Sequence, residues 1–227
     1  MARDVGGAGM KPSKSHLMIF VSHSHRDKEI ASTIKEELER IGLSVFVAHE
    51  DISPTEEWQG TILKKLKECD VFLALLTKDF EKSHWTDQET GLAIAFNKAI
   101  IPIKIDANPY GFISKYQALR WQSDPKQNIK ALVKILYGKG VVSTDALIES
   151  FAKSKSFQDA GFKSDLLRDV AKFTKKQINT IAKAAMQNDQ IFNSFKAKEY
   201  LSGIFLKYQD SVASTLMDKL KQLSLVT

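Results

Sequence analysis

Short apolar runs alternate with longer segments of helical periodicity through the first half of the chain. Four runs rich in β-branched and other apolar residues predict buried strands, at Leu17–Val21, Leu43–Val47, Val71–Thr77 and Ile100–Ile105. The segments between and after them repeat apolar residues every three to four positions and predict helices, at Asp27–Ile41, Ser53–Leu66, Ser83–Lys98 and Asn128–Tyr137. The strands do not alternate apolar with polar residues, so we expect both of their faces to be covered. This order predicts an α/β fold built on an open, parallel, flavodoxin-like sheet.

After Gly140 the pattern becomes helical throughout, which predicts a small all-α domain following the sheet. The expected helices are Thr144–Ala152, Ser164–Phe173, Thr174–Asn188 and Ala197–Leu223. The last carries an apolar seam of about seven turns, so it is a candidate oligomerisation element; burial of the seam within the same chain is the alternative. We therefore divide the chain into 17–140 and 141–227. Residues 1–16 carry no core pattern, and we interpret them as a disordered tail or a remnant of cloning.

Composition narrows the class of protein. Hydrophobic residues make up 43% and charged residues 26% of the 227 residues, which is typical of a globular protein. The single cysteine excludes a disulfide framework and a thiolate metal cluster, and it favours a cytoplasmic location. No apolar stretch approaches the roughly 20 residues that span a bilayer, and no signal peptide is recognisable, so no membrane partner is expected. The net charge of +6 suits the binding of anionic small molecules and is too small to indicate a nucleic-acid partner.

Six segments of the first half form a specific set through their order and spacing. They are Ile19–Ser24, Gly42–Phe46, Trp58, Cys69–Leu73, Ser83–Glu89 and Ile100–Ile103. This set resembles a Toll/interleukin receptor (TIR) domain of the bacterial and archaeal branch, over about residues 17–137. Residues 141–227 resemble no family that we can name. The resemblance implies the TIR fold for the first half of the chain.

The TIR resemblance implies one of two activities. Some members are scaffolds that assemble through TIR–TIR contacts. Others hydrolyse or cyclise NAD, which is their substrate and not a cofactor, and release nicotinamide with ADP-ribose or a cyclic isomer, often as a defence signal. In the enzymatic members activity generally depends on packing of TIR against TIR. These members share a glutamate on the helix after the third strand, four residues beyond a tryptophan, and Trp85 and Glu89 match that spacing.

Physical chemistry is consistent with a site at Trp85 and Glu89. Residues four apart on a helix lie on one face, so an indole and a carboxylate can line one pocket, and we expect the carboxyl to lie open at the rim of the sheet. A carboxylate stabilises the oxocarbenium character that ribose acquires when nicotinamide leaves as a neutral ring. An indole can stack on the dinucleotide. The alternatives are that Glu89 forms a capping box with Thr86, and that Trp85 only packs.

The first loop offers weaker candidates for substrate binding. Ser22, His25 and Arg26 follow the first strand, where the family's first loop contacts substrate. Of these, His25 and Arg26 can donate hydrogen bonds to a pyrophosphate. Capping of the following helix is the alternative. His23 and His25 would point to one side if the strand continued, but no third ligand accompanies them, so we predict no metal site.

The second loop departs from the family pattern. Ala48 stands where enzymatic relatives commonly have an acidic residue, and Glu50 and Asp51 are the candidates to replace it. Because this loop often mediates TIR assembly, its partner choice stays open.

These observations predict a TIR-domain NAD glycohydrolase or cyclase with Glu89 as the catalytic carboxylate and Trp85, His25, Arg26 and Ser22 as substrate-binding residues. The expected setting is an antiviral defence or signalling pathway in the cytoplasm. The expected partners are NAD and further copies of the chain, bound through the TIR domain and the C-terminal helices. The alternative is a non-catalytic TIR adaptor, and a third possibility is a module that binds NAD-like ligands without turnover.

Overall fold

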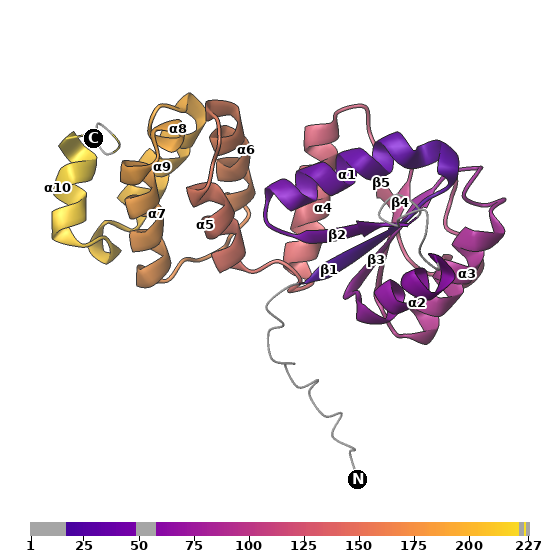
Figure 1. The fold of residues 1–227 in the computed structure, drawn as a ribbon. Helices are drawn as coiled ribbons and strands as arrows, with labels where there is room; N and C mark the ends of the chain where they lie inside the picture. The colour runs from indigo at the N-terminus through magenta and orange to yellow at the C-terminus, as the bar shows by residue number, and fades with distance from the viewer. Residues whose placement is uncertain (1–16, 49–57, 223–224, 226–227) are drawn as a thin grey trace, which may run out of the picture.

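The computed structural model describes residues 17–48, 58–222 and 225. An α/β part and a helical part lie side by side (Figure 1). The α/β part contains a sheet of five parallel strands in the order β2-β1-β3-β4-β5. The strands are β1 (Met18–Ser22), β2 (Ser44–Val47), β3 (Val71–Leu76), β4 (Ala99–Lys104) and β5 (Leu119–Arg120). The predicted open parallel sheet is therefore confirmed.

Helices cover both faces of the sheet. They are α1 (Lys28–Arg40), α2 (Trp58–Glu68), α3 (His84–Ala95) and α4 (Pro125–Gly138). Ile19 of β1 shares a buried cluster with residues of α1 and α4, whereas the next residue, Phe20, shares another with residues of α2 and α3. Successive side chains of a strand point to opposite faces, so a strand between two helical layers has to be apolar at every position. This explains why the strand sequences do not alternate.

The predicted strands β1 to β4 and their helices are confirmed, with boundaries that shift by a few residues. Gly42 follows α1 with a φ of +87°, a backbone conformation that glycine adopts without steric cost. The predicted start of a helix at Ser53 lies outside the described residues. The strand β5 was not predicted, because its two residues form no apolar run and are identified as a strand only by their pairing with Ile103 and Lys104.

The helical part differs from prediction in three places. Its elements are α5 (Thr144–Ala152), α6 (Phe157–Leu167), α7 (Lys175–Gln187), α8 (Asp189–Phe192), α9 (Phe195–Lys207) and α10 (Ser214–Gln222). The first difference is the short helix α8, which was not expected. The expected helix Ser164–Phe173 is wrong, because α6 starts earlier, where the Ser156 side chain caps it by accepting from the Asp159 amide at 3.1 Å.

The expected long helix Ala197–Leu223 is also wrong, because it is interrupted between α9 and α10. The Asn179 side chain of α7 donates to the Ser211 carbonyl at 2.8 Å and accepts from the Ala213 amide at 2.9 Å, which satisfies backbone groups at the interruption. Leu201, Phe205 and Leu220 of the expected seam are buried in the core of the same chain.

A continuous apolar cluster joins the two parts. It runs from the α1 and α4 side of the sheet through Leu147 and Leu166 to Leu201. At the surface, the Lys134 ammonium of α4 donates to the Asp169 carboxylate at 3.2 Å. The division at residue 140 stays a prediction.

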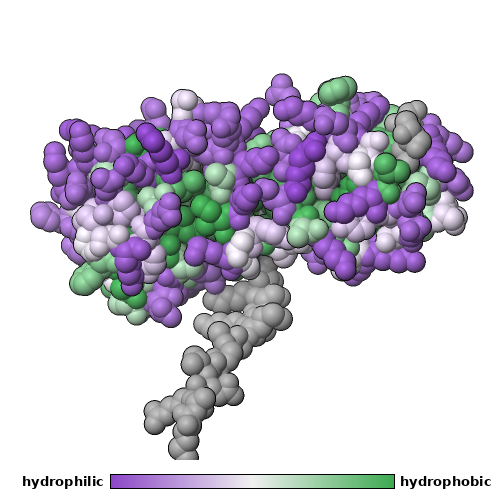
Figure 2. Space-filling model, turned by 180° about the vertical axis from the view of Figure 1, so that it is seen from behind, coloured by the Kyte–Doolittle hydropathy of each residue, from purple (hydrophilic) through white to green (hydrophobic). Residues whose placement is uncertain are grey.

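Hydrophilic side chains cover most of the face shown in Figure 2, and hydrophobic surface is concentrated in the middle of the α/β part. In the part of the chain that is described, no helix is both long and apolar enough to cross a membrane.

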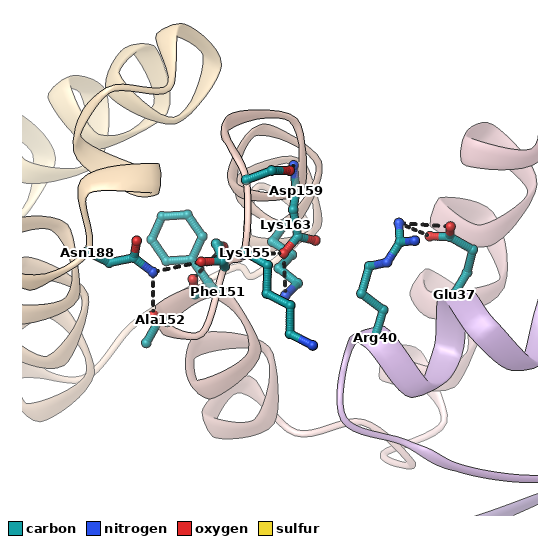
Figure 3. A network of polar contacts seen from close by, with 10 residues as sticks. Glu37, Arg40, Phe151, Ala152, Lys155, Asp159, Lys163 and Asn188 are labelled. Carbon is teal, nitrogen blue, oxygen red and sulfur yellow. Dashed lines mark hydrogen bonds and ion pairs between the residues drawn. The ribbon is translucent and has the colours of Figure 1, made fainter.

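Polar contacts connect the ends of α5, α6 and α8 in the helical part (Figure 3). Lys163, which is 3% exposed, pairs with the Asp159 carboxylate at 3.0 Å, and the Lys155 amide donates to the same carboxylate oxygen at 2.9 Å. The Asn188 amide group donates to the carbonyls of Ala152 and Ser154, both at 2.9 Å. These contacts satisfy backbone groups at the end of α5 and fix the start of α6.

Candidate active site at the carboxyl edge of the sheet

The order in which successive strands are added to the sheet reverses between β1 and β3. β2 lies on one side of β1, and β3, β4 and β5 follow on the other. In open α/β sheets the loops at the carboxyl ends of the strands diverge at such a switch point and leave a crevice for ligands. Ser22 is the last residue of β1, and α3 follows β3 after a short loop. The predicted residues Ser22, Trp85 and Glu89 are therefore carried by the elements that flank this point.

Glu89 lies in the interior and is 1% exposed. The Ser22 hydroxyl donates to its Oε2 at 2.5 Å, which joins α3 to the end of β1. Burial raises the pKa of Glu89 from 4.5 to about 7, because the charged form loses its hydration, and the Ser22 hydrogen bond opposes this rise. The expectation of an open carboxyl is wrong: the apolar packing of α3 on the sheet takes this face of the helix inside.

The capping-box alternative for Glu89 is also wrong. Ser83 is the N-cap of α3, and its side chain accepts a hydrogen bond from the Thr86 amide at 3.5 Å. Thr86 lies inside the helix, where its hydroxyl donates to the Phe80 carbonyl at 2.6 Å. Because another residue caps the helix, the Glu89 carboxyl is available for the contact with Ser22.

Trp85 pairs with a second tryptophan. Its ring lies 4.2 Å from that of Trp58, centroid to centroid, at an interplanar angle of 69°. Both side chains are half-buried, and Trp58 also packs on the cluster beneath α2 and α3. Nothing in the sequence indicated this pair. Only the packing of α2 beside α3 brings the two rings together, so their separation in sequence gives no signal.

The first loop places its candidates in different environments. β1 ends at Ser22, and His25–Asp27 form a 3-10 turn, so the alternation of a strand does not continue. His23 is 3% exposed whereas His25 is exposed, so the two imidazole rings lie in different environments. The Arg26 guanidinium is exposed and lies 3.5 Å from the Asp79 carboxylate of the loop after β3. Among the described residues, no group of three histidine, cysteine or acidic side chains could hold a metal.

A network around Asp27 joins the loops that follow β1 and β3. The Thr77 hydroxyl donates to Asp27 Oδ2 at 2.7 Å, and the Ser24 hydroxyl donates to the same oxygen. The Thr77 hydroxyl in turn accepts from the Phe80 amide at 3.0 Å. This network was not predicted, because its two loops lie about 50 residues apart in the chain. It stabilises the loops on either side of Ser22.

A third loop holds the outer side of α3. Tyr110 lies in the loop after β4, and its hydroxyl donates to the Asp87 carboxylate at 2.8 Å. Burial, together with this bond and the negative charge of Asp87, raises the pKa of Tyr110, so the hydroxyl keeps its proton. The first two turns of α3 are thus held from the β4 side as well as by Ser22.

Comparison with known proteins agrees with this arrangement. The family model described as TIR domain matches residues 19–136. The chain is 26% identical to the "Probable 2' cyclic ADP-D-ribose synthase BdTIR" of Brachypodium distachyon over 107 residues. This alignment covers 46% of each protein. The chain thus spans about half the length of this curated relative.

Two solved structures show more distant likeness. The TIR domain of the Toll-related receptor TRR-2 from Hydra magnipapillata is 18% identical, with a TM-score of 0.43, and the match covers 54% of this chain and 93% of that one. The Clostridium botulinum CMP N-glycosidase BcmB is 20% identical, with a TM-score of 0.37, and the match covers 51% and 97%. The family match rests on more than half of the 227 residues and on the five-stranded parallel sheet described above. This protein therefore belongs to the TIR domain family.

Proposed function

We propose that the chain is an NAD glycohydrolase or cyclase in which the Glu89 carboxylate acts on the nicotinamide–ribose bond. The observation that carries this proposal is a buried carboxyl with a pKa of about 7, bonded to Ser22 at the switch point of the sheet. Strongly perturbed carboxyl groups in such positions are frequent at active sites. The relative named as a 2' cyclic ADP-D-ribose synthase supports an activity of this type.

The chemistry needs one negative charge at a fixed place. When the C1'–N bond breaks, its electron pair goes to nicotinamide, which leaves as a neutral ring, and positive charge develops on the ribose. A carboxylate in a site of low dielectric stabilises this charge more than a solvated one does. Water then attacks C1' and loses a proton to give ADP-ribose, or a group of the same molecule attacks and closes a ring. In this scheme the Glu89 carboxylate reacts in its ionised form.

The neighbouring residues take separate roles in this proposal. Ser22 holds the carboxylate and favours its charged form, and the predicted contact of Ser22 with substrate is replaced by this positioning role. Trp85, backed by Trp58, offers an aromatic surface to the dinucleotide. His25 and Arg26 are exposed, and we assign them to binding of the pyrophosphate. The proposed antiviral or signalling role and the proposed self-association are carried over from the resemblance to TIR enzymes. The proposed cytoplasmic location rests on the single cysteine.

The burial of Glu89 has a direct consequence for this mechanism. At 1% exposure the carboxyl cannot touch a ribose without a rearrangement of the residues around it. The same burial favours the second candidate function, a non-catalytic TIR adaptor in which Ser22 and Glu89 only join α3 to β1. The two functions differ in whether the chain turns over NAD.

The test is to incubate the chain with NAD, both dilute and crowded on a surface, and to measure released nicotinamide by chromatography. Wild-type protein should release nicotinamide, and Glu89→Gln should not. Glu68→Gln is the matched control, because it makes the same chemical change at an exposed position on α2. Equal release by wild type and Glu89→Gln would remove Glu89 from its role. No release from wild type, dilute or crowded, would leave the adaptor function.

A further inference from the structure

A cleft in the helical part lies between α9 and the segment that follows α6. Its volume is about 320 Å³, and its lining includes Arg168, Phe173, Tyr200, Gly203, Lys207 and Tyr208. It belongs to residues 141–227 and shares no lining residue with the candidate active site. Its volume lies at the lower end of the range of small-molecule sites, so it fits a ligand smaller than a dinucleotide.

Aromatic rings with fixed positions form the apolar side of the cleft. Phe173 and Tyr208 contact edge to face, with centroids 6.1 Å apart and an interplanar angle of 82°. The Tyr208 hydroxyl accepts from the Phe173 amide at 3.2 Å and, within the described part of the chain, donates no hydrogen bond of its own. Tyr200 is buried, and its hydroxyl donates to the Leu167 carbonyl at 3.4 Å. Phe173 and Tyr200 are buried and line the apolar side, whereas Tyr208 is half-buried and offers both a ring and a hydrogen-bond donor to a planar group.

Two cations lie at the same cleft. The Arg168 guanidinium lies 5.4 Å from the Tyr200 ring centroid and is shared between Asp165 at 3.2 Å and Glu199 at 3.7 Å. The Lys207 ammonium lies 5.4 Å from the Tyr208 ring centroid. In the described ranges Lys207 takes part in no salt bridge, so its positive charge is less neutralised than that of Arg168. A ligand with an anionic group beside an aromatic ring would meet both features.

Gly203 leaves room along the α9 side of the cleft. It lies inside α9, where glycine costs about 1 kcal/mol of stability relative to alanine. A Cβ added to this residue would meet no atom within 4 Å, so helix packing gives no reason for the glycine. A side chain at this position would extend into the space that a ligand would occupy. The glycine is therefore consistent with an open binding site.

We propose that this cleft binds a nucleoside monophosphate, with the base against the rings of Phe173 and Tyr208 and the phosphate at Lys207 and Arg168. The assignment goes beyond the proposed NAD chemistry and does not depend on it. The segment that lines the cleft is also held to the α/β part, because Asp169 accepts a hydrogen bond from Lys134 of α4 at 3.2 Å. An occupant would thus contact a segment that joins the two parts of the chain.

Isothermal titration calorimetry of the full chain with AMP, GMP, CMP and UMP tests the proposal. At least one of the four should bind. The corresponding nucleoside, which lacks the phosphate, and ribose 5-phosphate, which lacks the base, should each bind about ten-fold more weakly. Gly203→Leu should lower the affinity at least ten-fold by filling the space. Lys207→Gln should lower it about ten-fold through loss of a charged contact.

Gly138→Leu is the matched control, because its added Cβ also meets no atom within 4 Å but lies at the end of α4, outside the cleft. Thermal melting by circular dichroism checks that each variant folds. Failure of all four nucleotides to bind would overturn the proposal. So would binding that Gly203→Leu leaves unchanged, since the nucleotide would then lie elsewhere, for instance at the sheet. Equal binding of ribose 5-phosphate would reduce the cleft to an anion site and would also contradict the proposal.

Discussion

Replacing Glu89 with glutamine removes a buried ionisation while it keeps the size of the side chain and an acceptor for the Ser22 hydroxyl. In the folded chain the pKa of Glu89 is about 7, against 4.5 for a solvated glutamate. Below pH 4.5 the carboxyl is protonated in both the folded and the unfolded state. Between pH 4.5 and 7 only the folded state keeps the proton, so a rise in pH favours unfolding. The stability that the protonated carboxyl contributes is therefore lost as the pH rises through about 7.

The difference in pKa sets the size of this effect. Each unit corresponds to about 1.4 kcal/mol, so the free energy of unfolding of wild type should fall by about 3 kcal/mol relative to Glu89→Gln between pH 4.5 and 8. For a chain of this length that corresponds to a gap of roughly 6–12 °C in the melting temperature. At pH 8 and above the variant should be the more stable protein, although it should have lost the NAD chemistry.

Thermal unfolding by circular dichroism from pH 4.5 to 9 measures this gap directly. Glu68→Gln controls for the chemical change itself, because that side chain is exposed on α2. A gap between wild type and Glu89→Gln that stays constant across the range would refute the reasoning. A wild type that is the more stable of the two at pH 9 would refute it as well, because the ionised carboxylate would then be compensated inside the fold.

Two further predictions concern the site and the helical part. The rate of NAD cleavage should rise as the pH passes about 7, where Glu89 ionises. Ser22→Ala should move the midpoint of the pH–rate profile upward, because it removes the hydrogen bond that lowers the pKa of Glu89. An unchanged midpoint would contradict this coupling. Lys163→Met should lower the free energy of unfolding in urea by about 3–5 kcal/mol, since it leaves the Asp159 carboxylate buried without its cation, and Lys163→Met combined with Asp159→Asn should recover part of the loss. Lys153→Met, in an exposed pair of the same spacing, should change stability far less; an equal change would refute the role of burial.

The sequence was most informative where local pattern and burial act together. A strand between two helical layers must be apolar at every position, so β1, β3 and β4 could be predicted from their composition alone. β5 has no such pattern, because Leu119 and Arg120 become a strand only by pairing with β4. The interruption after α9 was missed for a similar reason. The periodicity of the apolar residues continues across it, while the Asn179 side chain that satisfies its backbone belongs to α7.

For the candidate site, the sequence determined which residue types stand at which spacing. Glu89 is the fourth residue after Trp85, and this spacing puts both on one face of a helix. The sequence could not determine the direction of that face, because burial depends on what packs against the helix and not on its own periodicity. Only the tertiary structure brings Ser22 to Glu89 and Trp58 to Trp85. These partners come from separate strands and helices, and their contacts arise from the order in which the sheet is assembled. The raised pKa of the carboxyl follows from the same packing, since desolvation is a property of the surroundings of a group and not of the group itself.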